Sequence, residues 1–417
     1  MVATALACWL LDLLSHRGVY GHIQDSLYVT PFWQDAIATF NGQLPYRDFP
    51  LEYPPLSLVV FLLPVLLPGG GLGFYEYRTA FEVVMALCAM ALVPVVVATV
   101  VRLGGRRTDI LVAVGLLAVA PLLLGPLWIS RYDLWPALLT AAATLAILAG
   151  RFRIAFAVLA LAVLAKVYPA VLIPIFVAYA WRAAGRREAI IATATGTVMG
   201  LAGLMPFVLI DAPGALDPFA RAIARPLQIE TLGASVLAAL HDWLGLAIPR
   251  VSYTFNSYNV EGAAASTAAT LQTIALVALL VAIWFAAARG PADPWRLVVA
   301  CAAAICVDVA LGKVLSPQYV IWLIAPIVIL VAIDGARPLA ALAAILVLTQ
   351  LYYPVLYQRY VQRFDPSATI AVLERNVALI LLAIYLIVAT AMFVWPRPAN
   401  AAATRAAELP RAAEPPA

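Results

Sequence analysis

Residues 154–181 read IAFAVLALAVLAKVYPAVLIPIFVAYAW, an apolar stretch that carries one charge, Lys166. Arginines flank it on both sides, at 151 and 153 and again from 182 to 187, so both ends are expected to face the cytoplasm. The 28 residues between are too few for two full spans of about 20 residues each. We therefore expect two half-length helices that meet at Lys166-Val-Tyr168-Pro169, where proline breaks the helix and the freed backbone groups need a wet or protein-lined cavity.

The composition outside this stretch indicates a polytopic membrane protein. Of 417 residues, 65% are hydrophobic and 12% are charged, and the mean hydropathy is +0.96. The net charge of +4 comes from scattered loop arginines, so it gives no indication of nucleic-acid binding. The four cysteines lie in apolar stretches and are expected to pack as small hydrophobic residues. His16, His22 and His241 lack metal-ligand spacing, and no metal or other cofactor is predicted.

The apolar stretches and the charges between them predict the topology. Short arginine-rich loops alternate with long loops rich in aromatic, amide and acidic residues, and the arginine-rich set is placed in the cytoplasm. Stretches of spanning length lie near 75–101, 109–127, 133–149, 189–211, 263–288, 295–312, 319–334, 338–354 and 370–395. We predict an all-α fold of about 12 transmembrane helices with half-length helices and both termini in the cytoplasm.

The remaining segments complete the predicted organisation. The first apolar stretch, residues 1–14, is short for a span and lacks a signal-peptide cleavage site, and residues 56–67 are interpreted as a re-entrant or interfacial helix. A single transmembrane domain is expected over residues 1–396, with outer loops at 15–55 and 212–262. Residues 397–417 are expected to form a disordered cytoplasmic tail.

Polar residues converge on the outer side of this topology. The chain has only two lysines, Lys166 and Lys313, and each lies in an apolar context beside a proline. An ammonium at membrane depth is costly, so such residues usually face a cavity or a partner, and an ammonium binds phosphate well. The topology places these residues on the outer side: Asp25, Glu52, Arg131, Asp133, Lys166, Arg225, Glu230, Lys313, Gln318 and Arg359. Their shared side predicts one outer site.

The first outer loop combines an acid with many aromatic side chains. Asp25 follows the first apolar stretch, residues 32–40 are expected to form a helix lying on the membrane, and Trp33 is its interfacial anchor. A carboxylate can accept the proton of a sugar hydroxyl, and aromatic faces stack on the C–H surfaces of sugars. The alternative for Asp25 is an ordinary solvated loop acid.

Several short motifs, in order along the chain, resemble those of C-type membrane glycosyltransferases. The resemblance is greatest to glycosyltransferase family 87, the polyprenol-phosphate-mannose-dependent mannosyltransferases and related arabinofuranosyltransferases, and it covers about residues 20–335. The motifs are Asp25-Ser-Leu-Tyr28, Gly42-Gln-Leu-Pro45-Tyr46, Glu52-Tyr53-Pro54-Pro55, Arg131-Tyr132-Asp133-Leu-Trp135-Pro136, Lys166-Val-Tyr168-Pro169 and Ser316-Pro317-Gln318-Tyr319.

The resemblance implies a C-type (GT-C) architecture in the plasma membrane and an inverting glycosyltransferase with an outward-facing site. It implies a polyprenyl-phosphate donor, a lipid or glycan acceptor, and mannose as the sugar, with arabinofuranose as the competing choice. The aspartate after the first span, Asp25, would be the catalytic base, with Asp35 and Asp48 as fallback candidates. Candidates for the donor phosphate are Lys166, Lys313, Arg131 and Arg225. Candidate substrate contacts are Tyr28, Glu52, Tyr53, Asp133, Tyr168, Glu230, Gln318 and Tyr319.

Other interpretations of the same residues stay open at the level of sequence. Arg131 and Asp133 could form a local ion pair at a helix end, and Lys313 could pair with Asp308 in the same helix. A helix beginning at Pro226 could be a lid or a capped interfacial helix, and the aromatic segment 253–259 could contact carbohydrate or lipid headgroups. A lipid or solute transporter, or a flippase, is the competing functional class, since it too has many spans, broken helices and buried cations.

Overall fold

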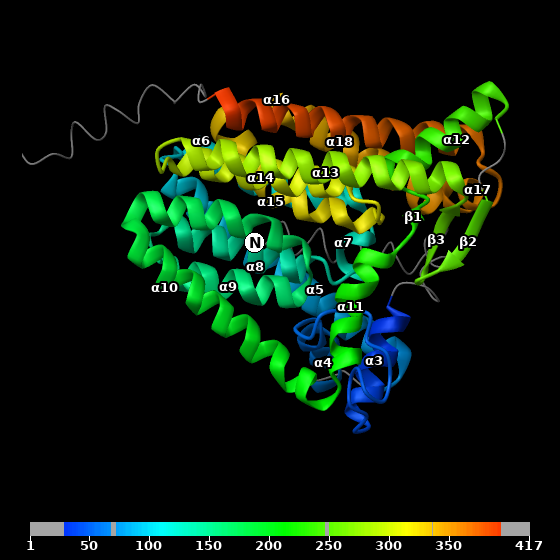
Figure 1. Ribbon diagram of the computed structural model, residues 1–417, viewed down its shortest axis with the longest axis horizontal. Helices are drawn as coiled ribbons and strands as arrows, with labels where there is room; N and C mark the ends of the chain where they lie inside the picture. The colour runs from blue at the N-terminus through cyan, green and yellow to red at the C-terminus, as the bar shows by residue number, and fades with distance from the viewer. Residues whose placement is uncertain (1–28, 68–71, 247–249, 336, 393–417) are drawn as a thin grey trace, which may run out of the picture.

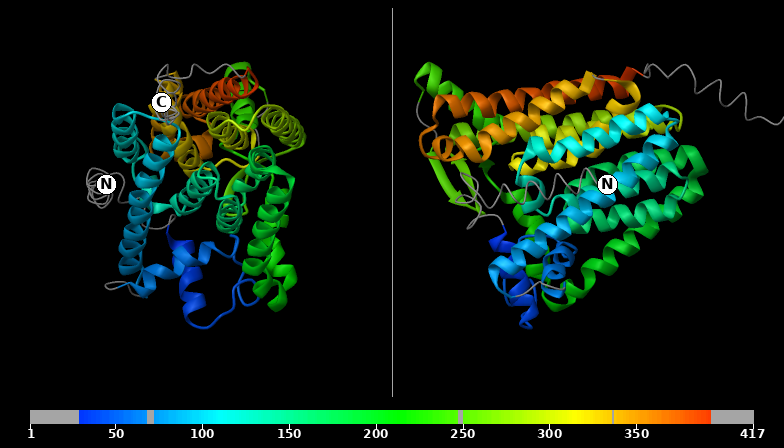
Figure 2. Two further views of the ribbon diagram at one scale, coloured as in Figure 1. Left: turned by 90° about the vertical axis from the view of Figure 1, so that its left-hand side faces the viewer. Right: turned by 180° about the vertical axis from the view of Figure 1, so that it is seen from behind.

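The computed structural model describes residues 29–67, 72–246, 250–335 and 337–392 (Figure 1). Within these ranges the chain is almost entirely helical, which confirms the predicted all-α polytopic class. Helices are expected because, in a bilayer, backbone polar groups have to be satisfied within the chain itself. One small sheet is the exception, and it lies at the end of the helical bundle shown at the right of Figure 1 and, seen from behind, at the left of the right-hand panel of Figure 2.

Eight helical segments are long and apolar enough to span a membrane. In chain order they comprise α5 (Phe74–Arg102), α6 (Arg107–Leu124), η1 (Tyr168–Leu172) with α10 (Ile173–Ile210), α13 (Ala263–Arg289), α14 (Pro294–Leu311), η2 (Pro317–Val320) with α15 (Ile321–Asp334), α16 (Arg337–Gln350) with the π-helical turn η3 (Leu351–Leu356) and α17 (Tyr357–Arg363), and α18 (Pro366–Met392). The predicted count of about 12 spans is therefore not confirmed within the described part of the chain.

Shorter helices complete the bundle, and several of them lie in the connections between the long helices. Four of them are apolar: α4 (Ser57–Leu66), α8 (Leu134–Leu148), α9 (Phe152–Ala165) and α12 (Leu232–Leu244). The others are α3 (Thr30–Phe40), α7 (Leu127–Ser130) and α11 (Ala212–Ala224). α3 agrees with the helix predicted over 32–40, and it packs Phe32 against Phe61 of α4 with ring centroids 4.6 Å apart.

The broken segment around Lys166 forms as the sequence predicts. α9 ends at Ala165, η1 follows, and α10 then changes direction at Gly185, whose φ of 86° suits glycine. The second limb of α10 lies against α9, because a Cβ on Gly196 would come within 2.9 Å of the Phe156 carbonyl oxygen. Gly203 meets Leu164 further along, so this limb runs in the same direction as α9.

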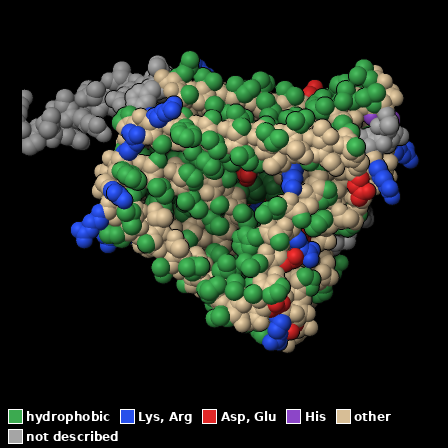
Figure 3. Space-filling view, in the orientation of Figure 1, with side chains coloured by type: hydrophobic (Ala, Val, Ile, Leu, Met, Phe, Trp, Pro, Cys, Tyr) green, Lys and Arg blue, Asp and Glu red, His purple; other side chains and the backbone are tan. Residues whose placement is uncertain are grey.

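The arginine-rich loops meet at one end of the bundle. Arg153 pairs with Glu188 at 2.9 Å, and Arg182 donates a hydrogen bond to the Gly290 carbonyl oxygen at 2.6 Å. Figure 3 shows a group of basic side chains, coloured blue, at this end, on the left, away from the sheet. α9 runs from this end to Lys166, and α14 runs from it to Lys313. Both lysines therefore lie at the opposite ends of their helices from the arginines.

The sheet corrects the prediction for the second long loop. β2 (Arg250–Thr254) and β3 (Ser257–Glu261) form an antiparallel hairpin, and β1 (Leu227–Gln228) pairs with β3. Phe255 and Asn256 make the two-residue turn with φ values of 54° and 52°, as a type I′ turn requires. The helix expected at Pro226 is wrong: residues 227–228 are satisfied by strand pairing, and α12 begins at Leu232 with Thr231 as its N-cap.

Candidate active site

A cavity of about 740 Å³ lies where the ends of several helices meet, at the end of the bundle away from the arginine-rich loops. The structure brings ten of the predicted site residues to its wall: Glu52, Tyr53, Arg131, Asp133, Lys166, Tyr168, Arg225, Lys313, Gln318 and Tyr319. They come from five separate stretches of the chain, at 52–53, 131–133, 166–168, 225 and 313–319. Asp25 and Tyr28 lie outside the described residues, but Thr30 and Pro31, shortly after them, line the cavity.

Lys166 and Asp133 form a buried ion pair at one side of this cavity. The Lys166 Nζ lies 2.6 Å from Asp133 Oδ1, which also accepts a hydrogen bond from the Trp322 indole at 2.8 Å. The rings of Tyr132, Tyr319 and Trp322 surround the ammonium at 4.6, 4.8 and 5.1 Å from their centroids. Burial lowers the pKa of Lys166, and the charge of Asp133 opposes that shift. The sequence left open whether Asp133 pairs with Arg131 at the helix end. In the structure Asp133 pairs with Lys166.

Aromatic rings form a continuous wall beside this pair. Tyr168 stacks on Trp322 at 4.0 Å and 3°, and Tyr319 stacks on the same indole at 4.1 Å. The Tyr168 hydroxyl lies 3.0 Å from the Thr140 hydroxyl. The three rings stack on one another and give the polar cavity one apolar wall.

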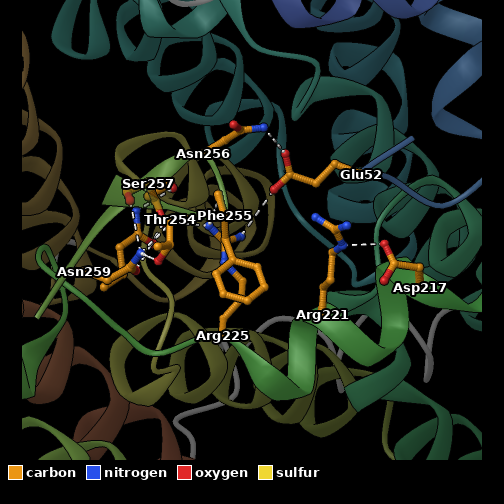
Figure 4. A network of polar contacts seen from close by, with 11 residues as sticks. Glu52, Asp217, Arg221, Arg225, Thr254, Phe255, Asn256, Ser257 and Asn259 are labelled. Atoms are coloured by element: carbon orange, nitrogen blue, oxygen red, sulfur yellow. Dashed lines mark hydrogen bonds and ion pairs between the residues drawn. The ribbon is translucent and has the colours of Figure 1, made fainter. Parts of the chain in front are cut away.

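A second polar cluster connects the hairpin to the first loop (Figure 4). Asn256 donates to Glu52 Oε2 at 3.0 Å, and Arg225 Nη1 lies 3.8 Å from Glu52 Oε1. Arg225 also donates to the Phe255 carbonyl at 3.0 Å and to the Ser257 hydroxyl at 2.9 Å. Glu52 and Asn256 are 204 positions apart in the sequence, so this cluster fixes the hairpin turn over the segment that carries Tyr53.

Lys313 has a different environment from Lys166. It lies in the loop after α14, and its ammonium donates to the Ile223 carbonyl oxygen of α11. Within the described ranges it forms no ion pair with a carboxylate, so the alternative pairing with Asp308 is not observed. Burial lowers the pKa of Lys313. Because no described carboxylate neutralises the Lys313 ammonium, its charge can pair with an anionic ligand in the cavity.

The lysine lies where the cavity meets an apolar surface. Leu276 and Thr273 of α13 and Ile223 of α11 line the cavity, and Ile223 is 78% exposed. Figure 3 shows a hollow below α13 that is bordered by hydrophobic side chains, with basic and acidic atoms at its edge. Such a site can accommodate a molecule with both an apolar chain and a charged head.

Asp35 and Asp48, the fallback candidates for the catalytic base, are not among the residues that line the cavity. For Asp35 of α3, burial, with a further contribution from Glu52, raises the pKa to about 7. Asp48 is paired with Arg47 at 2.8 Å and accepts from the Leu44 amide at 2.7 Å, and the hydrogen bond from Arg47 lowers its pKa.

Glu230 also lies outside the cavity wall, in contrast to its predicted place among the substrate contacts. It is 2% exposed, and burial raises its pKa to about 7. Its carbonyl oxygen accepts hydrogen bonds from Arg375 and Asn376 of α18, the latter at 3.1 Å. The residue belongs to a buried network that holds the start of α12 against α18.

The structure adds three residues to the cavity wall that were not among the predicted site residues. They are Trp322, Asn256 from the segment 253–259 that was considered for carbohydrate contact, and Asp308, which was considered only as a partner of Lys313. Trp322 lies one helical turn after Tyr319, a spacing that places both rings on one face. An acid within an apolar span, as at Asp308, is itself a signal for a functional site.

Of the comparisons with known proteins, the match to a family model covers most of the cavity residues. The model of glycosyltransferase family 87 matches residues 51–317, more than half of the chain, and this range includes Glu52, Lys166 and Lys313. No curated protein matches the sequence. Among solved structures, the chain is similar to the oligosaccharyltransferase of Archaeoglobus fulgidus, crystallised with a tethered acceptor peptide, at 12% identity and a TM-score of 0.38. The alignment covers 94% of this chain and 55% of that protein, so the chain spans about half of its length.

Proposed function

Because the chain belongs to glycosyltransferase family 87, as its motifs predicted, we propose that it transfers a sugar from a polyprenyl-phosphate donor to a lipid or glycan acceptor. The multi-pass helical fold makes it a membrane glycosyltransferase. The proposed sugar is mannose, which the family resemblance implies first, and arabinofuranose is the competing choice. The family match favours this function over the transporter or flippase that the composition alone left open.

The observation that carries the choice of donor is the environment of Lys313. Its ammonium has a backbone carbonyl as its partner and no carboxylate within the described residues, and it borders a polar cavity. Beside it, α11 and α13 present Ile223 and Leu276, which give an apolar path for a polyprenyl chain. A lipid phosphate needs both a cation and an apolar surface, because its phosphate binds cations and its chain remains in the hydrocarbon of the bilayer.

The proposed chemistry is a single displacement with inversion. Asp25 removes the proton of the acceptor hydroxyl as that oxygen attacks the anomeric carbon, and the bond to the phosphate oxygen breaks. The electron pair of that bond leaves on the polyprenyl phosphate, which needs no proton of its own. Lys313 and Arg225 stabilise the phosphate charge, and preorganised donors of this kind contribute a few kcal/mol each.

The sidedness of the proposal follows from the two ends of the bundle. α9 and α14 begin at arginine-rich loops and end at Lys166 and Lys313 in the cavity. With the arginine-rich loops in the cytoplasm, the cavity would open on the outer face. We propose the plasma membrane as the location, with the reaction on its extracytoplasmic side.

The test is transfer of labelled sugar from polyprenyl-phosphate-mannose by membranes that contain the protein, compared with the Lys313→Met variant. The proposal expects label to move from donor to product in wild-type membranes and far less in the variant. If polyprenyl-phosphate-arabinofuranose is consumed and the mannose donor is not, the sugar assignment is wrong. If neither donor is consumed, the donor class is wrong.

A further inference from the structure

An unused carboxylate faces the cavity from inside a candidate membrane span. Asp308 lies in α14, one turn before Gly312, and it contributes to the cavity wall. Its neighbours Cys306, Val307, Val309 and Ala310 are all buried and apolar. The proposed chemistry assigns this acid no role, and within a span an acid is costly enough that it usually serves a ligand or a pathway.

The protein supplies no polar partner for this carboxylate among the residues described. Both lysines of the cavity are engaged elsewhere, Lys166 with Asp133 and Lys313 with the Ile223 carbonyl. The contrast with Asp133 is direct, because that acid is fully buried and has two hydrogen-bond donors of its own. An acceptor without donors is costly in a site of low dielectric constant, and a hydrogen bond from a bound molecule would remove this cost.

The chemistry of a carboxylate narrows what that molecule presents. In its ionised form its oxygens only accept hydrogen bonds, and their charge repels a phosphate, so the phosphate belongs with Lys313. An apolar chain offers nothing to a carboxylate. Vicinal hydroxyl groups of a sugar offer two donors at once. In the proposed donor the sugar is bonded directly to the phosphate, so both are held within this one cavity, beside the ring wall of Tyr168 and Trp322.

We propose that Asp308 binds hydroxyl groups of the transferred sugar and thereby sets which sugar the enzyme accepts. This inference rests on the proposed function and adds to it a specificity-determining residue. It predicts an unusual combination of properties: removing Asp308 weakens recognition of the donor sugar and leaves the fold as stable as before, or more stable, because an acid without a partner at membrane depth is costly.

The test uses the full-length purified protein. It compares polyprenyl-phosphate-mannose with a series of deoxymannose donors on the same lipid, each of which lacks one hydroxyl of the sugar. Wild type is expected to discriminate against at least one deoxy donor by about 10- to 100-fold in kcat/KM, the value of a hydrogen bond to a charged group. Asp308→Ala is expected to raise KM for the full donor by about that factor, to lose the discrimination, and to unfold at the same or a higher temperature. Asp308→Asn, which keeps one acceptor, is expected to fall between. Glu188→Gln, which removes an acid at the arginine-rich end, is the matched control and is expected to behave as wild type.

The outcomes separate this inference from the proposed function. If wild type turns over the mannose donor while Asp308→Ala keeps its KM and its discrimination, the inference fails and the proposed function stands. If Asp308→Ala lowers the unfolding temperature and Asp308→Asn restores it without a change in donor discrimination, the residue is structural and the inference fails. If wild type consumes no lipid-linked sugar, the proposed function fails and this inference with it.

Discussion

The ammonium of Lys166 lies 2.6 Å from the carboxylate of Asp133, and both groups lie among the stacked rings of Tyr168, Tyr319 and Trp322. This pair joins the end of α9 to the start of α8 in the wall of the cavity. The two lysines of the chain therefore have different roles. Lys166 is neutralised within the protein, whereas Lys313 has a carbonyl oxygen as its partner and faces the cavity.

The Lys166–Asp133 pair predicts non-additive mutational effects. Lys166→Met or Asp133→Leu alone leaves one buried charge unpaired, and each is expected to lower the free energy of unfolding by about 3–5 kcal/mol. The double variant, Lys166→Met with Asp133→Leu, is expected to be more stable than the sum of the single effects. Denaturant or thermal unfolding in detergent measures this coupling. Strictly additive losses would show that the two groups do not interact.

Lys313→Met is expected to impair donor use and leave the fold intact. Losing a charge-assisted contact to phosphate should raise KM for a polyprenyl-phosphate sugar by about 10- to 100-fold. Lys313→Arg retains the charge and is expected to recover most of the loss. Arg153→Gln removes a cation at the opposite end of the bundle, where it pairs with Glu188, and is expected to keep wild-type KM. Equal KM values in Lys313→Met and wild type would remove Lys313 from the phosphate site.

The hydrogen bond from Asn256 to Glu52 predicts that the hairpin is held in place at its turn. Asn256→Gly removes this bond but suits the positive φ of 52°, so the turn itself is not strained. We expect faster hydrogen exchange in β2 and β3, and little change in α13, which serves as the internal control. Unchanged exchange in the hairpin would mean that the contact with Glu52 does not hold it.

Glu230 predicts a specific dependence of stability on pH. Burial raises its pKa in the folded state to about 7, above the ordinary glutamate value of 4.5. Between these two pH values Glu230 is protonated in the folded state and ionised in the unfolded state. Its contribution to the free energy of unfolding is therefore fully present below about pH 4.5 and is lost as pH rises through 7. Glu230→Gln is expected to remove this loss, so the difference in unfolding temperature, variant minus wild type, should increase from pH 5 to pH 8. A difference that falls over this range would contradict the assignment.

The sequence predicted the helical architecture well because its signals are local. Runs of apolar residues between arginine-rich loops marked α5, α13 and α18 to within a few residues, and Pro169 beside Lys166 located the break between α9 and α10. Shared sidedness of the loops was enough to bring Glu52, Arg131, Lys166 and Lys313 to one cavity. Topology could do this because each span carries its two ends to opposite sides of the bundle.

What the sequence could not supply depends on contacts between distant segments. The hairpin at 250–261 was missed because Phe255-Asn256 is a weak signal for a type I′ turn, in which the central positions favour Asn, Asp and Gly. Glu230 was placed in the site because its loop is on the right side, but Arg375 and Asn376 hold its backbone in a buried network. Nothing local distinguishes Lys313, whose partner is a carbonyl oxygen, from Lys166, whose partner is a carboxylate 33 residues away.

We propose that Asp25, which follows the first apolar stretch, removes the proton of an acceptor hydroxyl that attacks a donor held in this cavity, and the Asp25→Asn variant tests this step. The measurement is the rate at which purified wild type and variant release polyprenyl phosphate from polyprenyl-phosphate-mannose in the presence of acceptor. The account predicts release by wild type and a rate about 10²–10⁴-fold lower in Asp25→Asn, with donor binding retained. Equal rates in the two proteins would contradict it.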